Sequence, residues 1–108
     1  DMIVTGGENV YSVEVESALS QHPAVAAASV IGVPDDKWGE AVHAVVVLKP
    51  GQSASAEVLV AHARGLIAGY KCPRSIEFRE ALPLTAAGKV QKTELRKPFW
   101  EGQSRNVA

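Results

Sequence analysis

The sequence contains little cysteine and no long apolar run. Cys72 is the only cysteine among 108 residues, which excludes an internal disulfide and a zinc site built from cysteines and is typical of a reducing compartment. No apolar run approaches the roughly 20 residues that a membrane-spanning helix needs. The first residues also lack the basic and apolar regions of a signal peptide. We therefore expect a cytoplasmic protein without a transmembrane segment.

Metal-binding, thiol and nucleic-acid chemistry also lack their usual signals. His22, His43 and His62 fall in different segments and show no metal-ligand spacing, so we expect no metal site. Cys72 has no recognisable histidine partner, so we do not expect it to act as a nucleophile. The net charge of −1 and the absence of a recognisable nucleic-acid-binding motif argue against nucleic acid as a partner.

The charges are nevertheless distributed unevenly along the chain. Residues 1–63 carry two basic and eight acidic residues, whereas residues 64–97 carry eight basic and three acidic ones. Such a split is typical of a chain whose second half meets an anion. Two solvated faces of opposite charge explain the same pattern, and charge alone favours this second explanation.

Length and composition fit one small domain that spans residues 1–108. Hydrophobic residues make up 46% of the chain and charged residues 21%, as in ordinary globular domains. Strands are expected at residues 2–5, 25–33, 41–48 and 75–79. The middle two strands are nearly all apolar, so we expect them to be buried on both faces, paired antiparallel and joined by a polar loop at 34–40. Residues 103–108 are expected to fray.

Helix signals separate these strands. Ser12 and Ser55 are typical N-cap residues, and Gly69 is expected to end the second helix. A last short helix is expected from Thr93, and Pro98 should end it or bend it. The order predicts an α+β fold, in which helices pack on a small, mostly antiparallel sheet that follows a short N-terminal β-hairpin.

The segment around Gly88 and Lys89 carries the strongest chemical signal. A lysine directly after a glycine, in a loop of small residues, places a compact ammonium where it can bridge two anionic oxygens of a reacting phosphate ester. The spacing of a P-loop is absent. Taken alone, Gly88-Lys89 fits a surface lysine more often than a catalytic one.

Eight segments together make a more specific pattern. In chain order they are residues 2–11 (MIVTGGENVY), 13–16 (VEVE), 22–25 (HPAV), 30–35 (VIGVPD), 38–40 (WGE), 70–73 (YKCP), 82–90 (LPLTAAGKV) and 95–96 (LR). This set resembles the C-terminal domain of the acyl-adenylate-forming enzymes. These include acyl-CoA synthetases, firefly luciferases and peptide-synthetase adenylation domains. The glycine pair before ENVY resembles the sequence of fatty-acyl and aryl-CoA ligases more than that of peptide-synthetase adenylation domains.

The resemblance implies a two-step reaction. A carboxylate attacks ATP to give acyl-AMP and pyrophosphate, and the thiol of coenzyme A then converts acyl-AMP to a thioester with release of AMP. In the family, a large N-terminal adenylation domain holds ATP, Mg²⁺ and the carboxylate. The chain is therefore expected to be a mobile lid that follows the interdomain hinge, has that domain as its partner and is inactive alone. The alternative is a non-catalytic interaction module with the same fold, although two intact motifs, Gly6-Gly7 and Gly88-Lys89, argue against it.

The resemblance also assigns roles to single residues. Lys89 matches the catalytic lysine of the adenylation step. Gly7, with Glu8 beside it, matches the pantetheine channel of the thioester step, for which a plain hairpin turn is the alternative. Trp38 is expected either to cover the core or to form a wall beside pantetheine.

The segment from Tyr70 to Arg74 is expected to contact the nucleotide of coenzyme A. Tyr70 offers an aromatic face for adenine, with core packing as an equal alternative, and Lys71 and Arg74 offer charges for phosphates. Cys72 departs from relatives that carry a basic residue there. Ser12 also departs from the family, in which proline is usual.

Overall fold

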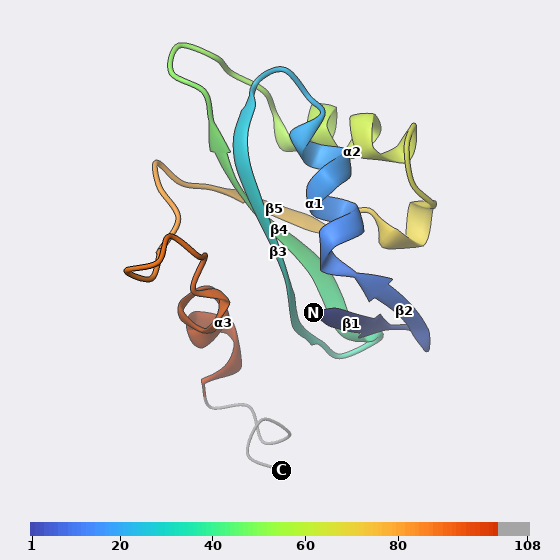
Figure 1. The fold of residues 1–108 in the computed structure, drawn as a ribbon. Helices are drawn as coiled ribbons and strands as arrows, with labels where there is room; N and C mark the ends of the chain where they lie inside the picture. Colours follow the sequence, from blue (N-terminus) through green and yellow to red (C-terminus); the bar gives the residue numbers. More distant parts are fainter. Residues whose placement is uncertain (102–108) are drawn as a thin grey trace.

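A five-stranded sheet runs through the middle of the molecule, with helices on both of its faces (Figure 1). The computed structural model describes residues 1–101, so the tail expected to fray lies outside the described residues. The elements are β1 (Met2–Thr5), β2 (Glu8–Tyr11), α1 (Ser12–Ser20), β3 (Val25–Asp35), β4 (Gly39–Leu48), α2 (Ala56–Arg64), the 3₁₀ helix η1 (Gly69–Lys71), β5 (Ser75–Phe78) and α3 (Lys92–Trp100). This arrangement confirms the α+β prediction.

The long antiparallel pair of β3 and β4 forms the centre of the sheet. Its register runs from Val25 opposite Leu48 to Asp35 opposite Gly39. The strands therefore extend into the loop that was predicted at residues 34–40. The predicted bounds of that loop are wrong, because β3 ends at Asp35 and β4 begins at Gly39. The turn is shorter because the Asp35 carboxylate accepts hydrogen bonds from the backbone N–H groups of Lys37 and Trp38, at 2.9 and 2.8 Å.

The other edge of β4 holds two strands. β1 pairs with it antiparallel at Thr5 and Gly39, and β2 completes the predicted N-terminal hairpin on the outside of β1. β5 pairs with β4 in parallel, from Ser75 opposite His43 onward. The parallel pairing was not predicted. It is possible because α2 and η1 form a long connection between β4 and β5.

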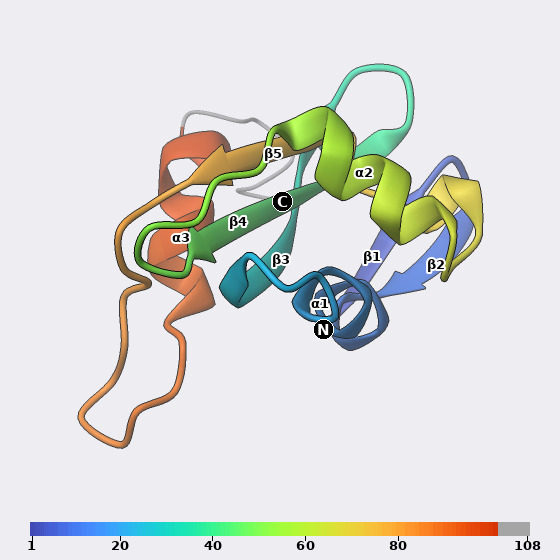
Figure 2. The same cartoon turned by 90° about the horizontal axis from the view of Figure 1, so that it is seen from above.

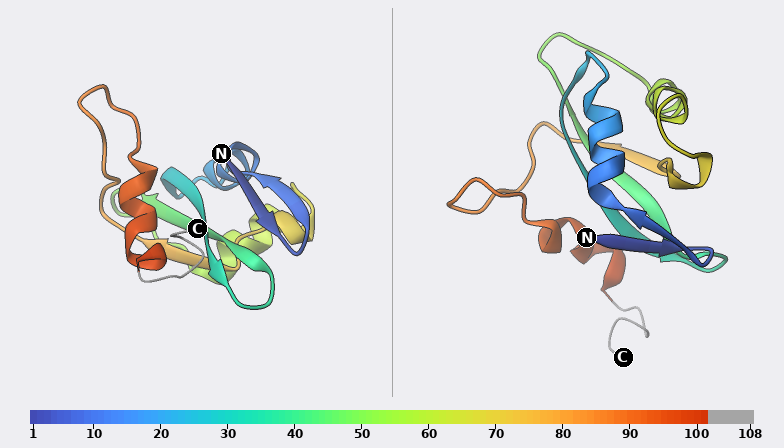
Figure 3. Two further views of the ribbon diagram at one scale, coloured as in Figure 1. Left: turned by 90° about the horizontal axis from the view of Figure 1, so that it is seen from below. Right: turned by 45° about the vertical axis from the view of Figure 1, so that its right-hand side comes forward.

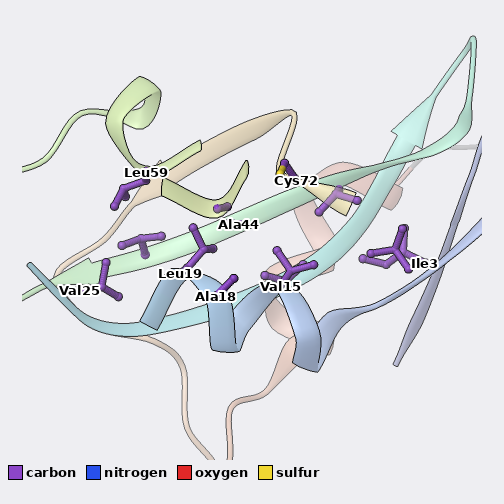
Figure 4. Close-up of a cluster of buried hydrophobic side chains, with 13 residues drawn as sticks. Ile3, Val15, Ala18, Leu19, Val25, Ala44, Leu59 and Cys72 are labelled. Carbon is purple, nitrogen blue, oxygen red and sulfur yellow. The ribbon is translucent and has the colours of Figure 1, made fainter. Parts of the chain in front are cut away.

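Two apolar clusters hold the layers together. On one face of the sheet, Val15 and Leu19 of α1 meet Leu59 of α2 over β4 (Figure 4). On the opposite face, Leu95 of α3 packs against Ile31 and neighbouring strand residues. Because successive residues of a strand point to opposite faces, β3 and β4 supply side chains to both clusters. The prediction that these strands are buried on both faces is confirmed.

Helix ends depart from the predictions in two places. The Ser55 hydroxyl caps α2 as expected, accepting a hydrogen bond from the Val58 N–H at 3.2 Å. Ser12 is not an N-cap; α1 begins at Ser12 itself, and its hydroxyl accepts a bond from the Lys92 ammonium at 3.0 Å instead. Gly69 does not end α2, which stops at Arg64; Gly65 is its C-cap residue, and the Gly65 N–H donates to carbonyl oxygens of the last turn.

Pro98 does not end the last helix, since α3 continues to Trp100. Contacts with the sheet hold this end of the helix in place. The Trp100 indole N–H donates to the carbonyl oxygen of Gly32 at 2.9 Å, and the Phe99 ring lies 4.8 Å from that of His43.

The two regions to which the sequence assigns chemistry lie at opposite ends of the domain. The loop between β5 and α3 extends away from the sheet on one side (Figure 2). The turn between β1 and β2 lies on the far side, near η1 (Figure 3). The domain therefore presents two separate surfaces.

Candidate functional site

The loop before α3 forms a small hairpin, and Lys89 lies directly after its turn, opposite Thr85. Leu84 and Val90 form an antiparallel bridge. The Gly88 N–H donates to the Thr85 carbonyl at 2.9 Å, and the Thr85 N–H donates to the Lys89 carbonyl at 2.7 Å. Gly88 has φ +86°, a left-handed conformation that suits glycine, and this closes the turn just before the lysine. Lys89 is thus held by backbone bonds within an extended hairpin.

The Lys89 ammonium is exposed and has no hydrogen-bonding or ion-pair partner within residues 1–101. Other cations nearby are engaged: Lys92 and Arg96 contact Asp1, and Arg79 contacts Glu77. An unpaired ammonium on a protruding turn is available to an anion brought from outside the domain.

The opposite end is built around Gly6 and Trp38. The Gly6 N–H donates to the Trp38 carbonyl at 2.8 Å, which ties the β1–β2 turn to the β3–β4 turn. A Cβ atom on Gly6 would lie 2.7 Å from Cε3 of the indole. Trp38 therefore covers the backbone of the hairpin turn. Gly7 follows at φ +81°, with open space where its side chain would be, and Glu8 is exposed beside it.

Arg74 joins this end of the domain. Its guanidinium carbon lies 5.2 Å from the centre of the Trp38 ring, and the Lys37 ammonium lies 4.9 Å from the same ring. These distances suit attraction between a cation and an aromatic face. The structure thus brings the predicted residues Trp38 and Arg74 together at the Gly6-Gly7 turn.

Tyr70 and Lys71 lie in η1. Lys71 pairs with Glu14, a contact that the sequence pattern did not indicate. Tyr70 is 49% exposed, so core packing, one of its two expected roles, is wrong. The Lys71 ammonium lies 3.0 and 3.1 Å from the two carboxylate oxygens of Glu14. This hydrogen bonding raises the pKa of Lys71 above its ordinary value, against the effect of burial. Glu14 stands in the first turn of α1, where a carboxylate also suits the helix dipole, so its sequence position gave no sign of the pairing.

A groove of about 770 Å³ is lined by residues of β1, β3 and α3. Trp38 and Trp100 contribute to its lining, together with Met2, Val4 and Glu40. The Glu40 carboxylate accepts a hydrogen bond from the Val4 N–H at 2.9 Å, so it fixes the strand rather than pointing freely into the groove. The sequence pattern included the Trp38-Gly39-Glu40 triplet but indicated no role for Glu40 or Trp100.

The histidines make local contacts. His43 is buried, with Nδ1 2.6 Å from the Ser75 hydroxyl and Nε2 3.1 Å from Glu77. His22 and His62, expected to be apart, are neighbours whose ring centres lie 5.1 Å from each other. Within residues 1–101 no three His, Cys, Asp or Glu side chains gather as metal ligands. No helix in that part of the chain is long and apolar enough to cross a membrane.

Comparison with known proteins identifies the family. The chain matches the model of the AMP-binding enzyme C-terminal domain over residues 14–89. It is 50% identical over 99 residues to a feruloyl-CoA synthase from an Amycolatopsis species, which covers 92% of this chain and 20% of that enzyme. It is 44% identical over 114 residues to the medium/long-chain-fatty-acid–CoA ligase FadD8 of Mycobacterium tuberculosis, which covers 99% of this chain and 20% of the ligase.

A solved structure shows the same fold. ATP-bound MatB from Rhodopseudomonas palustris superimposes with a TM-score of 0.89 at 38% identity, over 94% of this chain and 20% of MatB. The chain thus spans about a fifth of the length of the relatives that it matches. It belongs to the AMP-binding enzyme C-terminal domain family, the C-terminal domain of the adenylate-forming acyl-CoA ligases.

Proposed function

We propose that this chain is the mobile C-terminal domain of an ATP-dependent, AMP-forming carboxylate–CoA ligase, and that Lys89 serves its adenylation step. One observation carries the proposal: Lys89 lies directly after the turn of an extended hairpin, with an exposed ammonium that has no partner within residues 1–101. The family match covers residues 14–89, so it includes the first limb of the hairpin, its turn and Lys89.

In the first step, a carboxylate oxygen attacks the α-phosphorus of ATP, and pyrophosphate leaves. The two reacting groups are both anionic and repel each other. The Lys89 ammonium, placed between them, would neutralise this repulsion and stabilise the charge that develops in the transition state. The other domain would hold the Mg²⁺ that accompanies ATP, because the described residues offer no cluster of metal ligands.

In the second step, the coenzyme A thiol attacks the acyl-AMP carbonyl, and AMP leaves. We assign the pantetheine channel to Gly7, with Glu8 and Trp38 beside it. Gly7 is suited to close approach, since no atom lies within 4 Å of the position of its missing Cβ.

We assign the nucleotide of coenzyme A to the neighbouring surface of Tyr70, Lys71 and Arg74. The exposed Tyr70 ring is available to stack on adenine, and Arg74 supplies a charge for phosphate. Lys71 would bind phosphate only in exchange for Glu14, its present partner. Since the Lys89 hairpin and this surface lie at opposite ends of the domain, a rotation between the two steps would present each surface in turn (Figures 2 and 3).

A graft tests the proposal. This chain would replace the matching segment of the Amycolatopsis feruloyl-CoA synthase, whose product identifies ferulate as the acid to supply. The truncated synthase and the 108-residue chain should each be inactive alone, and the graft should form feruloyl-CoA from ferulate, ATP and coenzyme A. A graft that folds but forms no acyl-AMP would favour the alternative, a non-catalytic interaction module.

A further inference from the structure

Lys92, three residues beyond Lys89, occupies an unusually complete ring of acceptors. Its ammonium lies 2.8 Å from the Glu16 carboxylate and 3.2 Å from that of Asp1. It also lies 3.0 Å from both the Ser12 hydroxyl and the Val30 carbonyl. The side chain is 18% exposed. Nothing in the sequence pattern indicated this environment, because its members are up to 91 positions apart.

This ring joins four elements at one atom. Asp1 precedes β1, Ser12 and Glu16 belong to α1, Val30 belongs to β3, and Lys92 is the first residue of α3. Glu16 strengthens the junction because its second role is to accept a hydrogen bond from the Val30 N–H at 2.9 Å.

Asp1 contacts α3 twice, since its carboxylate also lies 3.2 Å from the Arg96 guanidinium. The cluster of Lys92, Arg96, Asp1 and Glu16 is therefore neutral as a whole. Removing the Lys92 charge would leave Asp1 paired with Arg96 but Glu16 without its cation, so the ion pair that joins α1 to the start of α3 would be lost.

The same lysine stands at the base of the hairpin that carries Lys89. The Gln91 N–H donates to the Pro83 carbonyl at 2.8 Å and closes the hairpin one residue before Lys92. The remainder of α3 is held by the fully buried Leu95 and by the bond from Trp100 to Gly32. The Lys92 ring thus fixes the one end of α3 from which the hairpin projects.

We propose that Lys92 is a positioning residue for Lys89: its four-acceptor ring sets the direction in which the 83–91 hairpin leaves the domain. This inference rests on the proposed function of Lys89. Lys92 itself need not touch substrate. An error of about 1 Å in the position of a reacting group can cost about a hundredfold in rate, even when the altered residue lies away from the chemistry.

The two half-reactions of the graft separate positioning from folding. Lys92→Met should slow acyl-AMP formation by about ten- to a hundredfold and change thioester formation from supplied acyl-AMP by less than about threefold. Lys97→Met is the matched control on the same helix, because Lys97 is exposed and has no ion pair within residues 1–101; it should change neither step. Equal losses in both half-reactions for Lys92→Met would mean that the ring only stabilises the fold, and would overturn the inference.

A second variant guards against misfolding of the first. Glu16→Gln with Lys92→Met removes one carboxylate along with the ammonium, so less uncompensated charge remains buried. It should still form acyl-AMP slowly, because no ammonium holds the start of α3. Wild-type adenylation in this double variant would overturn the inference.

Motion of the hairpin gives a readout independent of activity. In the 108-residue chain, ¹⁵N order parameters of residues 84–90 should be lower in Lys92→Met than in wild type, falling toward the value of about 0.6 that marks flexible backbone. Those of β3 and β4 should not change. Identical order parameters in both proteins would contradict the inference. Lys89→Ala in the same graft assay tests the proposed function separately, since it should slow adenylation whatever Lys92 does.

Discussion

The indole of Trp38 lies so close to Gly6 that a Cβ atom on Gly6 would stand 2.7 Å from Cε3 of the ring. Gly6 also has φ +58° and donates its N–H to the Trp38 carbonyl. The next residue, Gly7, has φ +81° but open space at its Cβ position. Within the domain, the two adjacent glycines are therefore required for different reasons: Gly6 has both a left-handed backbone and a close contact with Trp38, whereas Gly7 has the left-handed backbone without a close contact.

Alanine substitutions should separate these two requirements. Gly7→Ala should cost about 1–2 kcal/mol of unfolding free energy, the usual penalty for a left-handed L-residue. Gly6→Ala should cost more, about 2–4 kcal/mol, because the indole must also move out of a packed position. Urea denaturation of the 108-residue chain measures both. Equal losses for the two variants would show that the Trp38 contact does not constrain the turn.

Gly7→Leu should affect the thioester step alone. The leucine side chain enters open space within the domain, so the fold should tolerate it about as well as alanine. If pantetheine passes this position, the added side chain blocks it, and thioester formation should fall at least tenfold while acyl-AMP formation is retained. Quenched-flow assays of the two half-reactions in the graft measure this; parallel losses in both would indicate a folding defect instead.

Glu77 should make stability depend on pH. Burial opposes ionisation of its carboxyl, but hydrogen bonds with Arg79 and His43 outweigh burial and lower its pKa from the ordinary 4.5. A carboxyl group whose pKa is lower in the folded protein than in the unfolded chain stabilises the fold at any pH above its unfolded-state pKa. This stabilisation is lost as the pH falls through the folded-state pKa. Wild type should therefore exceed Glu77→Gln in Tm by about 1–5 °C at pH 7.

The same difference should shrink as the pH falls below about 4.5. Glu80→Gln is the matched control, since Glu80 is exposed and has no partner within residues 1–101; its Tm should follow that of wild type throughout. Calorimetric melts from pH 3 to pH 7 provide the comparison. A difference that persists unchanged at pH 3 would rule out the ionised Glu77 as its source.

Leu95 should account for much of the attachment of α3. It is fully buried against Ile31 and Val45 on the sheet face opposite α1. Leu95→Ala should cost about 2–5 kcal/mol of unfolding free energy, since it removes buried methyl groups and leaves a cavity. Leu66→Ala, at a position 46% exposed, should cost less than about 1 kcal/mol. Similar losses for both would mean that α3 is held mainly by its polar contacts.

Local patterns were sufficient to predict the strands, the α+β class and one helix cap. The apolar runs of β3 and β4 indicated strands buried on both faces, and Ser55 indicated the start of α2, because these signals depend on neighbours in the sequence. The small residues and Gly88 indicated a loop before Lys89, but they did not indicate that this loop pairs as a hairpin. The eight motif segments indicated the family for the same reason, since each is a short run of adjacent residues.

Contacts between distant segments were not predictable in the same way. Ser12 has the residue type of an N-cap, but the Lys92 ammonium, 80 positions away, engages its hydroxyl. The sequence alone indicates that Lys71 is a free cation. In the fold, η1 lies near α1, and the Lys71 ammonium pairs with Glu14. In both cases the partner is chosen by tertiary packing, which overrides local preference.

The half-reactions of Lys89→Ala decide whether the hairpin lysine serves adenylation. Loss of one preorganised donor at a reacting centre typically costs about 10²–10³ in rate. In the graft, acyl-AMP formation from ferulate and ATP should fall by at least that much, and conversion of supplied acyl-AMP to the thioester should stay within about threefold of wild type. Lys49→Ala, which removes an exposed ammonium at the far end of β4, should change neither step. If Lys89→Ala forms acyl-AMP within a few-fold of wild type, Lys89 is an ordinary surface lysine and the proposed role of the hairpin is wrong.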